Sequence, residues 1–393
     1  MRAEPSPPVR VGLRCDAGPT TGVGHLVRCV ALAEELRARG AAVSFLADLG
    51  GVDWARRQLA ARGLALRPAP PDPRALVAAA RELDLDAVVL DSYELDPGHA
   101  AALRADGRVV AAIVDGDLRG QPADVYVDQN LDAEHARVAV PRGAVRLAGL
   151  PYALLRAEVR RLRPPAPRPA RDVGRPRVVC FFGGTDAYRA APVLTRLLVA
   201  TGAPCDAVVV AADAELAAEL AALRPAAGQA VTPVAPTDRL PELLAGADLA
   251  VSASGTSTWE LLCLGVPSAL VWVVDNQWLG YRRVTARGLA AGLGRLDDLR
   301  TDTAAARAAT ATLRGLLTDP GRRRELGRRA WAAIDAGGPR RVAGELLRQV
   351  AARRRAATDG GPTDGGPANG GVSDGGATDG GASEGELVSD PAR

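Results

Sequence analysis

The chain has 393 residues, 47% of them hydrophobic, and its 49 basic and 46 acidic residues give a formal net charge of +3. This length and apolar content allow two globular domains, and the near-balanced charge, with Arg scattered among Asp and Glu, gives no reason to expect nucleic acid as a partner. Every basic residue is Arg, and the absence of Lys excludes a P-loop lysine, a pyridoxal Schiff base and any other lysine nucleophile.

The amino-terminal residues 1–8 are rich in proline and lack the apolar core of a signal peptide, so we expect them to be disordered. No segment of the sequence reaches the roughly 20 apolar residues that span a bilayer. The cysteines are widely spaced without a C-x-x-C pair, which favours reduced thiols in apolar cores over a metal site or a disulfide: Cys15, Cys29, Cys180, Cys205 and Cys263. We therefore expect a cytoplasmic protein without membrane insertion.

Residues 9–162 alternate short β-branched runs with longer amphipathic ones. The expected strands cover residues 9–15, 43–46, 87–90, 109–114 and 125–127. Helix-length stretches separate the first four runs, and this alternation predicts a parallel sheet with crossover helices. The sequence therefore predicts a Rossmann-like amino-terminal domain over this range.

The loop after the first expected strand contains Gly22 and Gly24, followed by His25 and a helical pattern that extends to residue 36. The two glycines would allow a ligand to approach the backbone closely. A helix amino terminus carries partial positive charge, which disfavours the imidazolium and keeps His25 in the neutral form that a general base requires. A simple capping role for His25 is the alternative, and the spacing is not the G-x-G-x-x-G dinucleotide fingerprint.

Other polar residues could share this site with His25. Asp16 follows the first strand, where it could orient His25 or a water molecule, or serve only as a turn residue. Arg28 lies three residues after His25 and so on the same helix face, where a phosphate contact and an exposed salt bridge are both open. Asp91 and Tyr93 follow the third strand and face the same site, where Tyr93 could contact a substrate or pack within its loop.

Prolines dominate residues 163–176, and they predict an extended linker between two domains. Residues 177–355 repeat the alternation of the first half and predict a second Rossmann-like domain. Its expected strands lie near residues 177–182, 207–210, 249–252 and 269–273. Two doubly wound domains would place a cleft between the carboxyl ends of their strands. Residues 356–393 are rich in Gly, Asp, Thr and Pro, which predicts a disordered tail.

The turn after the third strand of the second half has the most specific pattern, with Ser254, Gly255 and Thr256 before a helical run that ends at Gly265. Backbone N–H groups and hydroxyls at such a helix start can hold a phosphate without lysine or metal. Glu260, in the first turn or so of that helix, can accept hydrogen bonds from a diol such as ribose, or it can simply complement the helix dipole. A second glycine turn facing the same cleft follows another strand: Gly183, Gly184 and Thr185.

In combination, residues 22–28 (GVGHLVR), 183–186 (GGTD) and 254–260 (SGTSTWE), with Asn276 and Gln277, resemble a known family. They are similar to the UDP-sugar hydrolases of pseudaminic acid biosynthesis and to the related spore-coat polysaccharide proteins, whose fold is similar to that of the GT-B glycosyltransferases. Residues 149–158 also resemble the family segment that precedes the linker, and we place Tyr152 of this segment among the substrate-binding residues. The resemblance covers residues 9–345 or so.

This resemblance implies two Rossmann-like domains with an interdomain cleft, in a GT-B-like fold. It also makes a return of the C-terminal helix, about residues 339–355, onto the first domain plausible, although the sequence pattern itself does not show this. It implies a hydrolase of UDP-2,4-diacetamido-2,4,6-trideoxy-β-L-altropyranose that releases UDP and the free sugar with inversion at the anomeric carbon. His25 would be the base, Glu260 would hold the uridine ribose, and Asn276 and Gln277 would belong to the nucleotide site. In physical terms, His25 would activate water while the turns at residues 183–185 and 254–256 stabilise the departing diphosphate.

Two features bear on metal binding. Asp115 and Asp117 form a D-x-D motif like that of GT-A glycosyltransferases, but those enzymes use the motif in their nucleotide-binding domain, and the nucleotide signals here lie in the second half. His99 and His135 have no partner at metal-ligand spacing, so we expect exposed or capping roles for them. We expect neither a metal nor a cofactor.

Two other functions would use the same residues. A GT-B glycosyltransferase would transfer the sugar of a UDP-sugar donor to an acceptor other than water, with the same His25 and the same UDP site. The aromatic content of 3% and the lack of an amphipathic membrane-docking stretch favour a soluble substrate and water. A non-catalytic nucleotide-sugar-binding protein is the other alternative.

Overall fold

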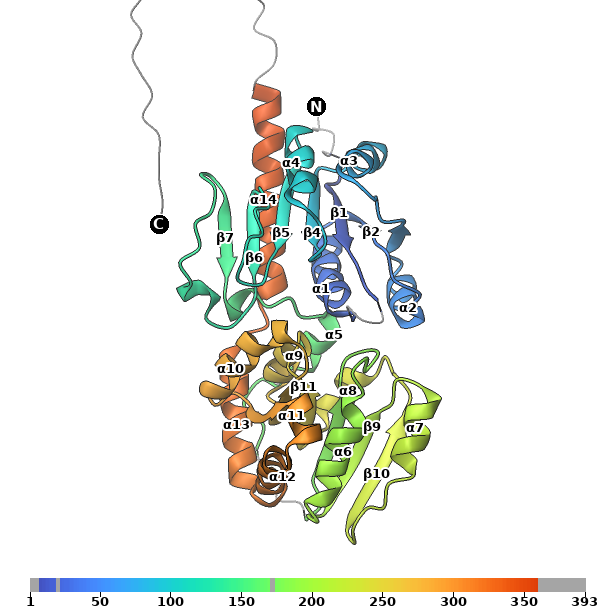
Figure 1. The fold of residues 1–393 in the computed structure, drawn as a ribbon. Coiled ribbons are helices and arrows are strands. Elements are labelled where there is room, and N and C mark those ends of the chain that lie inside the picture. Colours follow the sequence, from blue (N-terminus) through green and yellow to red (C-terminus); the bar gives the residue numbers. More distant parts are fainter. Residues whose placement is uncertain (1–6, 19–21, 170–173, 360–393) are drawn as a thin grey trace, which may run out of the picture.

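Two parallel sheets, one above the other in Figure 1, organise the chain. The computed structural model describes residues 7–18, 22–169 and 174–359. The expectations of disorder for residues 1–6 and 360–393, and the expectation of an extended linker at residues 170–173, fall outside the described residues.

The first sheet has seven strands in the order β3-β2-β1-β4-β5-β6-β7, all paired in parallel. The strands are β1 (Arg10–Cys15), β2 (Ala42–Leu46), β3 (Ala65–Arg67), β4 (Ala87–Asp91), β5 (Val109–Ile113), β6 (Val125–Asp128) and β7 (Val145–Ala148). The strand order reverses between β1 and β4, where a doubly wound sheet opens its ligand crevice. The five expected strands are confirmed, whereas the short edge strands β3 and β7 were not predicted.

Helices cover both faces of this sheet. They are α1 (Gly24–Ala38), α2 (Asp53–Ala61), α3 (Pro73–Glu82) and α4 (Pro97–Ala105), with short 3₁₀ turns η1 (Ala133–His135) and η2 (Leu150–Tyr152). The next helix, α5 (Ala157–Leu162), buries its Val159 among residues of the second domain. In α1, Leu26, Cys29 and Leu36 recur at helical spacing and are buried in the first core. Asp72 and Asp96 cap α3 and α4, each before a proline that is compatible with a helix start.

The second sheet has six parallel strands in the order β10-β9-β8-β11-β12-β13, with the reversal between β8 and β11. The strands are β8 (Arg177–Phe181), β9 (Cys205–Val210), β10 (Gln229–Val234), β11 (Leu249–Ala253), β12 (Ser268–Trp272) and β13 (Ala291–Arg295). The helices are α6 (Ala190–Ala200), α7 (Ala214–Ala221), α8 (Leu240–Ala245), α9 (Ser257–Leu264), η3 (Asp275–Gln277), α10 (Trp278–Ala286), α11 (Leu296–Thr301), α12 (Thr303–Thr318) and α13 (Pro320–Ala333). The sheet confirms the predicted second Rossmann-like domain.

The last helix, α14 (Gly338–Asp359), returns to the first domain (Figure 1). Its residues Val342, Leu346 and Val350 are buried in the core that α1 and the first sheet form. The expected second domain, residues 177–355, is therefore wrong at its end, and the helix continues past the expected start of the tail at 356. The i, i+4 spacing of these apolar residues predicts a buried face but not the domain that buries it.

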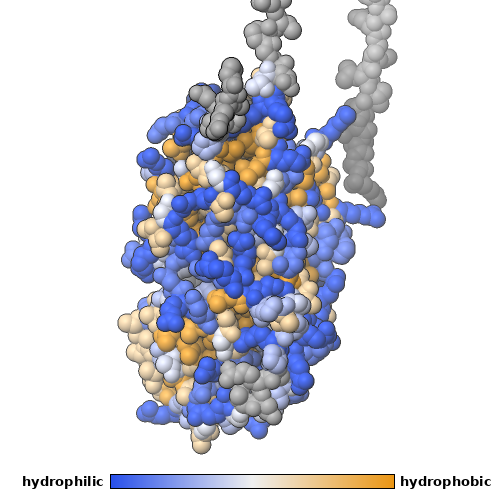
Figure 2. Space-filling view, turned by 180° about the vertical axis from the view of Figure 1, so that it is seen from behind, coloured by the Kyte–Doolittle hydropathy of each residue, from blue (hydrophilic) through white to orange (hydrophobic). Residues whose placement is uncertain are grey.

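The next observations concern membrane-spanning helices, the polarity of the surface and the cysteines. Among the described residues no helix is long and apolar enough to cross a membrane. Figure 2 shows hydrophilic and hydrophobic residues interspersed over the back of the molecule. All five cysteines are buried without disulfides, as the sequence predicts.

Candidate functional site

Three glycine-containing turns from the two domains meet at the carboxyl ends of the sheets. A Cβ atom on Gly24, the first residue of α1, would lie 3.0 Å from Oγ1 of Thr256 before α9. A Cβ atom on Gly184, after β8, would lie 3.2 Å from Cγ2 of Val23. The loop at residues 22–25 and the turns at 183–185 and 254–256 therefore lie next to one another where the two domains meet.

The amino termini of α1 and α9 lack side-chain caps in the part of the chain that the structure describes. Their first N–H groups and partial positive charges are available to an anion, and Gly24 beside Thr256 brings the two helix starts together. The start of α6 differs, because the carboxylate of Asp186 accepts hydrogen bonds from the backbone N–H groups of Ala190 and Ala191. Of the three helix starts at these turns, those of α1 and α9 are therefore the ones without a side-chain acceptor on their first N–H groups.

Residues after β12 border the turn at 254–256. A Cβ atom on Gly255 would lie 3.9 Å from Nε2 of Gln277, and Oε1 of Gln277 accepts a hydrogen bond of 2.9 Å from the Val273 backbone. Asn276 is exposed, whereas Ser254 is buried. The structure thus brings Gln277 to the turn through its backbone anchor.

Glu260 in α9 forms a buried ion pair with Arg156 that the sequence did not predict. Nε and Nη2 of Arg156 donate to the two carboxylate oxygens of Glu260 at 2.9 and 3.0 Å. Nη1 of Arg156 donates to Glu158 at 2.6 Å. The carboxylate therefore has a side-chain partner in addition to the dipole of its own helix.

His25 projects from the first turn of α1 onto Asp91 at the end of β4. Its Nδ1 lies 2.6 Å from Oδ1 of Asp91, and its ring meets the edge of Tyr93 with centroids 4.7 Å apart. An ionised carboxylate only accepts hydrogen bonds, so Nδ1 carries the proton and Nε2 of the neutral ring has a lone pair. The helix cap position belongs to Val23, so the capping alternative for His25 is wrong.

Asp16 does not have the predicted place beside His25. Its carboxylate accepts a hydrogen bond of 2.5 Å from Arg14 and one of 3.2 Å from the backbone of Asp48. β1 ends at Cys15, which pairs with Asp91 in the neighbouring strand, and Asp16 bonds toward the loop after β2 instead. The expectation that Asp16 orients His25 is therefore corrected to Asp91.

Arg28 is neither an exposed salt bridge nor a phosphate contact, because its guanidinium is buried between two carboxylates. It donates to Asp91 at 2.7 and 2.5 Å and to Asp115 at 3.1 Å. Burial alone would raise the pKa of Asp91, but the charge of Arg28 and the hydrogen bonds from Arg28 and His25 lower it. Both carboxylates of this network are held ionised, since the pKa of Asp115 also lies well below its usual range, where Arg28, Tyr93 and Asn130 outweigh burial.

The other residues predicted to bind substrate differ from one another in burial and in their contacts. Asp91 is fully buried, so the expectation that it touches substrate is wrong, and its contact is with His25. Tyr93 is 49% exposed, and its hydroxyl donates to Asp115 at 2.6 Å. Tyr152 is partly buried and packs against the core of the first domain. Asp115, the first residue of the D-x-D motif, also accepts a hydrogen bond of 2.9 Å from Asn130.

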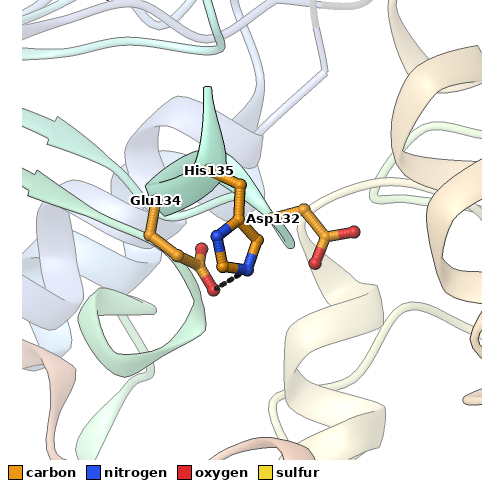
Figure 3. Close-up of side chains that lie close together, drawn as sticks. All are labelled: Asp132, Glu134 and His135. Atoms are coloured by element: carbon orange, nitrogen blue, oxygen red, sulfur yellow. Dashed lines mark ion pairs between the residues drawn. The ribbon is translucent and has the colours of Figure 1, made fainter. Parts of the chain in front are cut away.

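A separate group of possible metal ligands lies at η1, where Asp132, Glu134 and His135 place ligand atoms within 4.8 Å of one another (Figure 3). His135 therefore has neighbours that its spacing did not suggest. The group is largely exposed, and Asp132 already accepts a hydrogen bond of 2.6 Å from Arg287. His99, expected to be exposed or capping, is buried in α4, and Asp96 is the cap.

Comparisons with known proteins support the fold. No protein-family model and no curated protein sequence matches the chain. Among solved structures it is similar to Acinetobacter baumannii MurG, with a TM-score of 0.61 and 18% identity over 87% of this chain and 100% of that one. It is also similar to the glycotransferase of kitacinnamycin, with a TM-score of 0.58 and 18% identity over 87% of this chain and 99% of that one.

A further similar structure is UDP-GlcNAc 2-epimerase from Neisseria meningitidis bound to UDP-GlcNAc, with a TM-score of 0.58 and 10% identity over 86% of this chain and 100% of that one. Identities this low concern the fold alone. The narrower resemblance to pseudaminic acid hydrolases stays a prediction. The two parallel sheets, their strand orders and these similarities together establish that the chain has two Rossmann-like domains in a GT-B-like fold.

Proposed function

We propose that the chain is an enzyme that hydrolyses a UDP-diacetamido-trideoxyhexose, with water attacking the anomeric carbon and inverting it. One observation carries this proposal: His25, bonded to Asp91 at 2.6 Å, lies in the same turn that meets the uncapped start of α9. A base and an anion site thus lie side by side. The similarity to an epimerase bound to UDP-GlcNAc supports a UDP-sugar as the ligand of this fold.

The proton-transfer side of the mechanism uses His25 and Asp91. Asp91 accepts a hydrogen bond from the protonated Nδ1 of His25. The lone pair on Nε2 is then free to take a proton from the attacking water. Arg28 is bonded to both oxygens of Asp91, so the carboxylate stays ionised and compensates the imidazolium as it forms. A positioned general base of this kind contributes about 10²- to 10⁴-fold to a rate.

The leaving-group side uses the helix starts of the second domain and of α1. The diphosphate would lie against Ser254, Gly255 and Thr256, with open space for the sugar beside Gly22, where a Cβ atom would meet nothing within 4 Å. Because these donors are fixed before the reaction, they stabilise the charge that develops on UDP without reorganisation. The remaining proposed contacts are Gly183, Gly184, Thr185, Asn276 and Gln277 for the nucleotide and Tyr93 for the sugar.

A glycosyltransferase is the second candidate, favoured by the similarity to the kitacinnamycin glycotransferase. It would use the same base and the same UDP site with a hydroxyl of an acceptor in place of water. The two candidates differ in one observable: only the hydrolase releases free sugar when water is the sole acceptor.

The test is turnover of candidate UDP-sugars in ¹⁸O-water, followed by NMR and mass spectrometry. We expect free sugar of inverted configuration with the label on its anomeric oxygen, and a loss of at least about a hundredfold in rate for His25→Ala. Label in the phosphate would contradict attack at carbon. No free sugar until an acceptor is added would favour the transferase. UDP binding without turnover, or undiminished turnover by His25→Ala, would remove His25 as the base.

A further inference from the structure

A cavity of about 420 Å³ lies within the second domain, between the end of α10, the start of β13 and the helices α12 and α13. Its lining combines small residues of the strand with two arginines of α13, Arg322 and Arg329. Volumes of about 300 to 1,000 Å³ are typical of small-molecule sites. We propose that this cavity is a second ligand site, which binds an organic oxyanion: a molecule of about the size of a monosaccharide that carries a carboxylate or phosphate group.

The cavity lies at the opposite end of the second sheet from the interdomain site. The turns of that site follow the carboxyl ends of β8 and β11, whereas the first residues of β13 line the cavity. Helix α10 runs from one to the other, because it begins directly after Gln277 and ends at Ala286, two residues before Gly288 of the cavity. Both sites can therefore be filled at the same time, and the inference does not depend on the proposed function.

Two glycines give the guanidinium groups their places at the cavity. A Cβ atom on Gly315 of α12 would lie 2.7 Å from Nη1 of Arg322, and one on Gly288 would lie 2.6 Å from Nη1 of Arg329. Within the described ranges of the chain, the exposed guanidinium of Arg322 forms no hydrogen bond or ion pair. Its N–H donors are thus available to a ligand, and an arginine fork matches the paired oxygens of a carboxylate or phosphate.

The cavity also contains an acidic residue, Glu325, whose charge is already compensated. Its carboxylate accepts a hydrogen bond of 2.6 Å from Arg329 and two hydrogen bonds, of 2.8 and 2.9 Å, from Arg328. Arg322 adds a further positive charge on the same helix. Three arginines therefore surround one carboxylate, and the excess of positive charge favours an anion over a cation.

The size and the rest of the lining indicate an organic body on this anion. A water molecule takes up about 30 Å³ of the liquid, so the cavity has more room than a phosphate ion needs. Ala290, Ala291 and Leu326 contribute apolar surface, and Thr285 and Thr312 contribute hydroxyls. Thr285 donates its proton to a backbone carbonyl of its own helix at 2.8 Å, so its oxygen can still accept a hydrogen bond. Methyl groups beside hydroxyls suit a body of the sugar type.

The experiment is an NMR titration of the full chain with glucose 6-phosphate and with glucuronate, in the presence of saturating UDP. We expect at least one of the two to bind with a Kd below about 1 mM, and inorganic phosphate and uncharged glucose to bind at least about tenfold more weakly. Arg322→Gln should weaken the organic anion about fivefold or more, because its charge-assisted hydrogen bonds are lost. Thr312→Leu, which fills part of the cavity, should weaken it as well.

Arg324→Gln is the matched control, since Arg324 is an exposed arginine of the same helix outside the lining of this cavity, and it should bind the anion like the wild type. No binding of either organic anion below about 10 mM would overturn the inference. Binding that Arg322→Gln leaves unchanged, that UDP abolishes, or that glucose or phosphate matches would also overturn it. If UDP itself fails to bind while the anion binds through Arg322, the inference stands and the proposed function is wrong.

Discussion

The two sides of the interdomain site are built from different parts of the chain. On the first-domain side, His25 depends on side chains far along the sequence, with Asp91 at 2.6 Å and Arg28 joining Asp91 to Asp115. On the second-domain side, one local turn at 254–256 presents an uncapped helix start. The first side is suited to proton transfer because it fixes a single ring, and the second is suited to anions because it uses backbone dipoles.

The two sides should respond differently to amino-acid substitutions. A side-chain network is impaired when one member is removed, because the neighbours of that member each lose a hydrogen-bond partner. Backbone N–H groups remain in place when side chains change. We therefore expect changes on the first side to affect turnover and stability, and changes on the second side to affect nucleotide affinity through steric access.

The largest expected effect is that of Asp91→Asn. The amide can no longer accept the Nδ1 proton while satisfying Arg28 in the same way, so His25 loses its tautomer and orientation. We expect kcat to fall by about a thousandfold or more with little change in KM, as for an orienting carboxylate in other enzymes. Steady-state kinetics on the UDP-sugar substrate measure this directly.

Asp16→Asn is the control for that variant, since Asp16 bonds Arg14 and the Asp48 backbone and has no contact with His25. It should keep kcat within about twofold. If Asp16→Asn were the more damaging of the two, the assignment of Asp91 as the partner of His25 would be wrong.

The next effect is on stability, through Asp115→Asn. Asp115 accepts from Arg28, Tyr93 and Asn130, and the change should lower the free energy of unfolding by about 2 kcal/mol at pH 7. Its pKa is lower in the folded protein than in the unfolded chain, so its contribution is present above about pH 4 and is lost as the pH falls below that value.

Urea unfolding of wild type and Asp115→Asn between pH 3 and pH 8 tests both the size and the sign of this effect. The difference between the two proteins should be constant from about pH 5 upward and should shrink in more acid solution. A difference that grew on acidification would show that Asp115 is not stabilised as a carboxylate.

At the contact between the two sides, Gly24→Ala tests steric access. Its backbone φ is not in the left-handed region, so alanine adds no backbone strain, but the new Cβ would lie 3.0 Å from Oγ1 of Thr256. We expect UDP to bind about tenfold more weakly, with stability unchanged or raised because alanine favours helix. In a Thr256→Ala background the same change should cost less, and an equal cost in both backgrounds would rule out contact between the two residues.

The same contrast explains what the sequence could predict. The turns at 254–256 and 183–185 are local, since strand, glycine and helix follow one another within a few residues, and the structure places them together. The place of His25 in the first turn of a helix was likewise a local prediction. Its partner was not, because Asp91 lies 66 residues away and only the pairing of β1 with β4 brings it near.

The fold shows the same limit. Alternating patterns predicted two doubly wound domains and most strands, because each pattern reports the element in which it lies. The return of α14 to the first domain and the pairing of Arg156 with Glu260 depend on which surfaces meet, and the two partners of the ion pair are 104 positions apart in the sequence. No residue spacing within either segment contains that information.

The smallest expected effect is that of Tyr93→Phe, which tests whether the first side extends to the exposed rim. The ring remains against His25 at a centroid distance of 4.7 Å, and only the hydrogen bond to Asp115 is lost. Asp115 keeps Arg28 and Asn130, so kcat should fall by no more than about threefold.

Burial and the neighbouring Asp115 raise the pKa of the Tyr93 hydroxyl. The phenol should therefore stay neutral at about pH 10, where a free tyrosine side chain loses its proton. The alkaline limb of the pH–rate profile should therefore be the same for wild type and Tyr93→Phe. A steeper alkaline loss in the wild type alone would mean that the phenol itself titrates during turnover. In that case Tyr93 would take part in proton transfer together with His25, and would not serve only as a contact for the sugar.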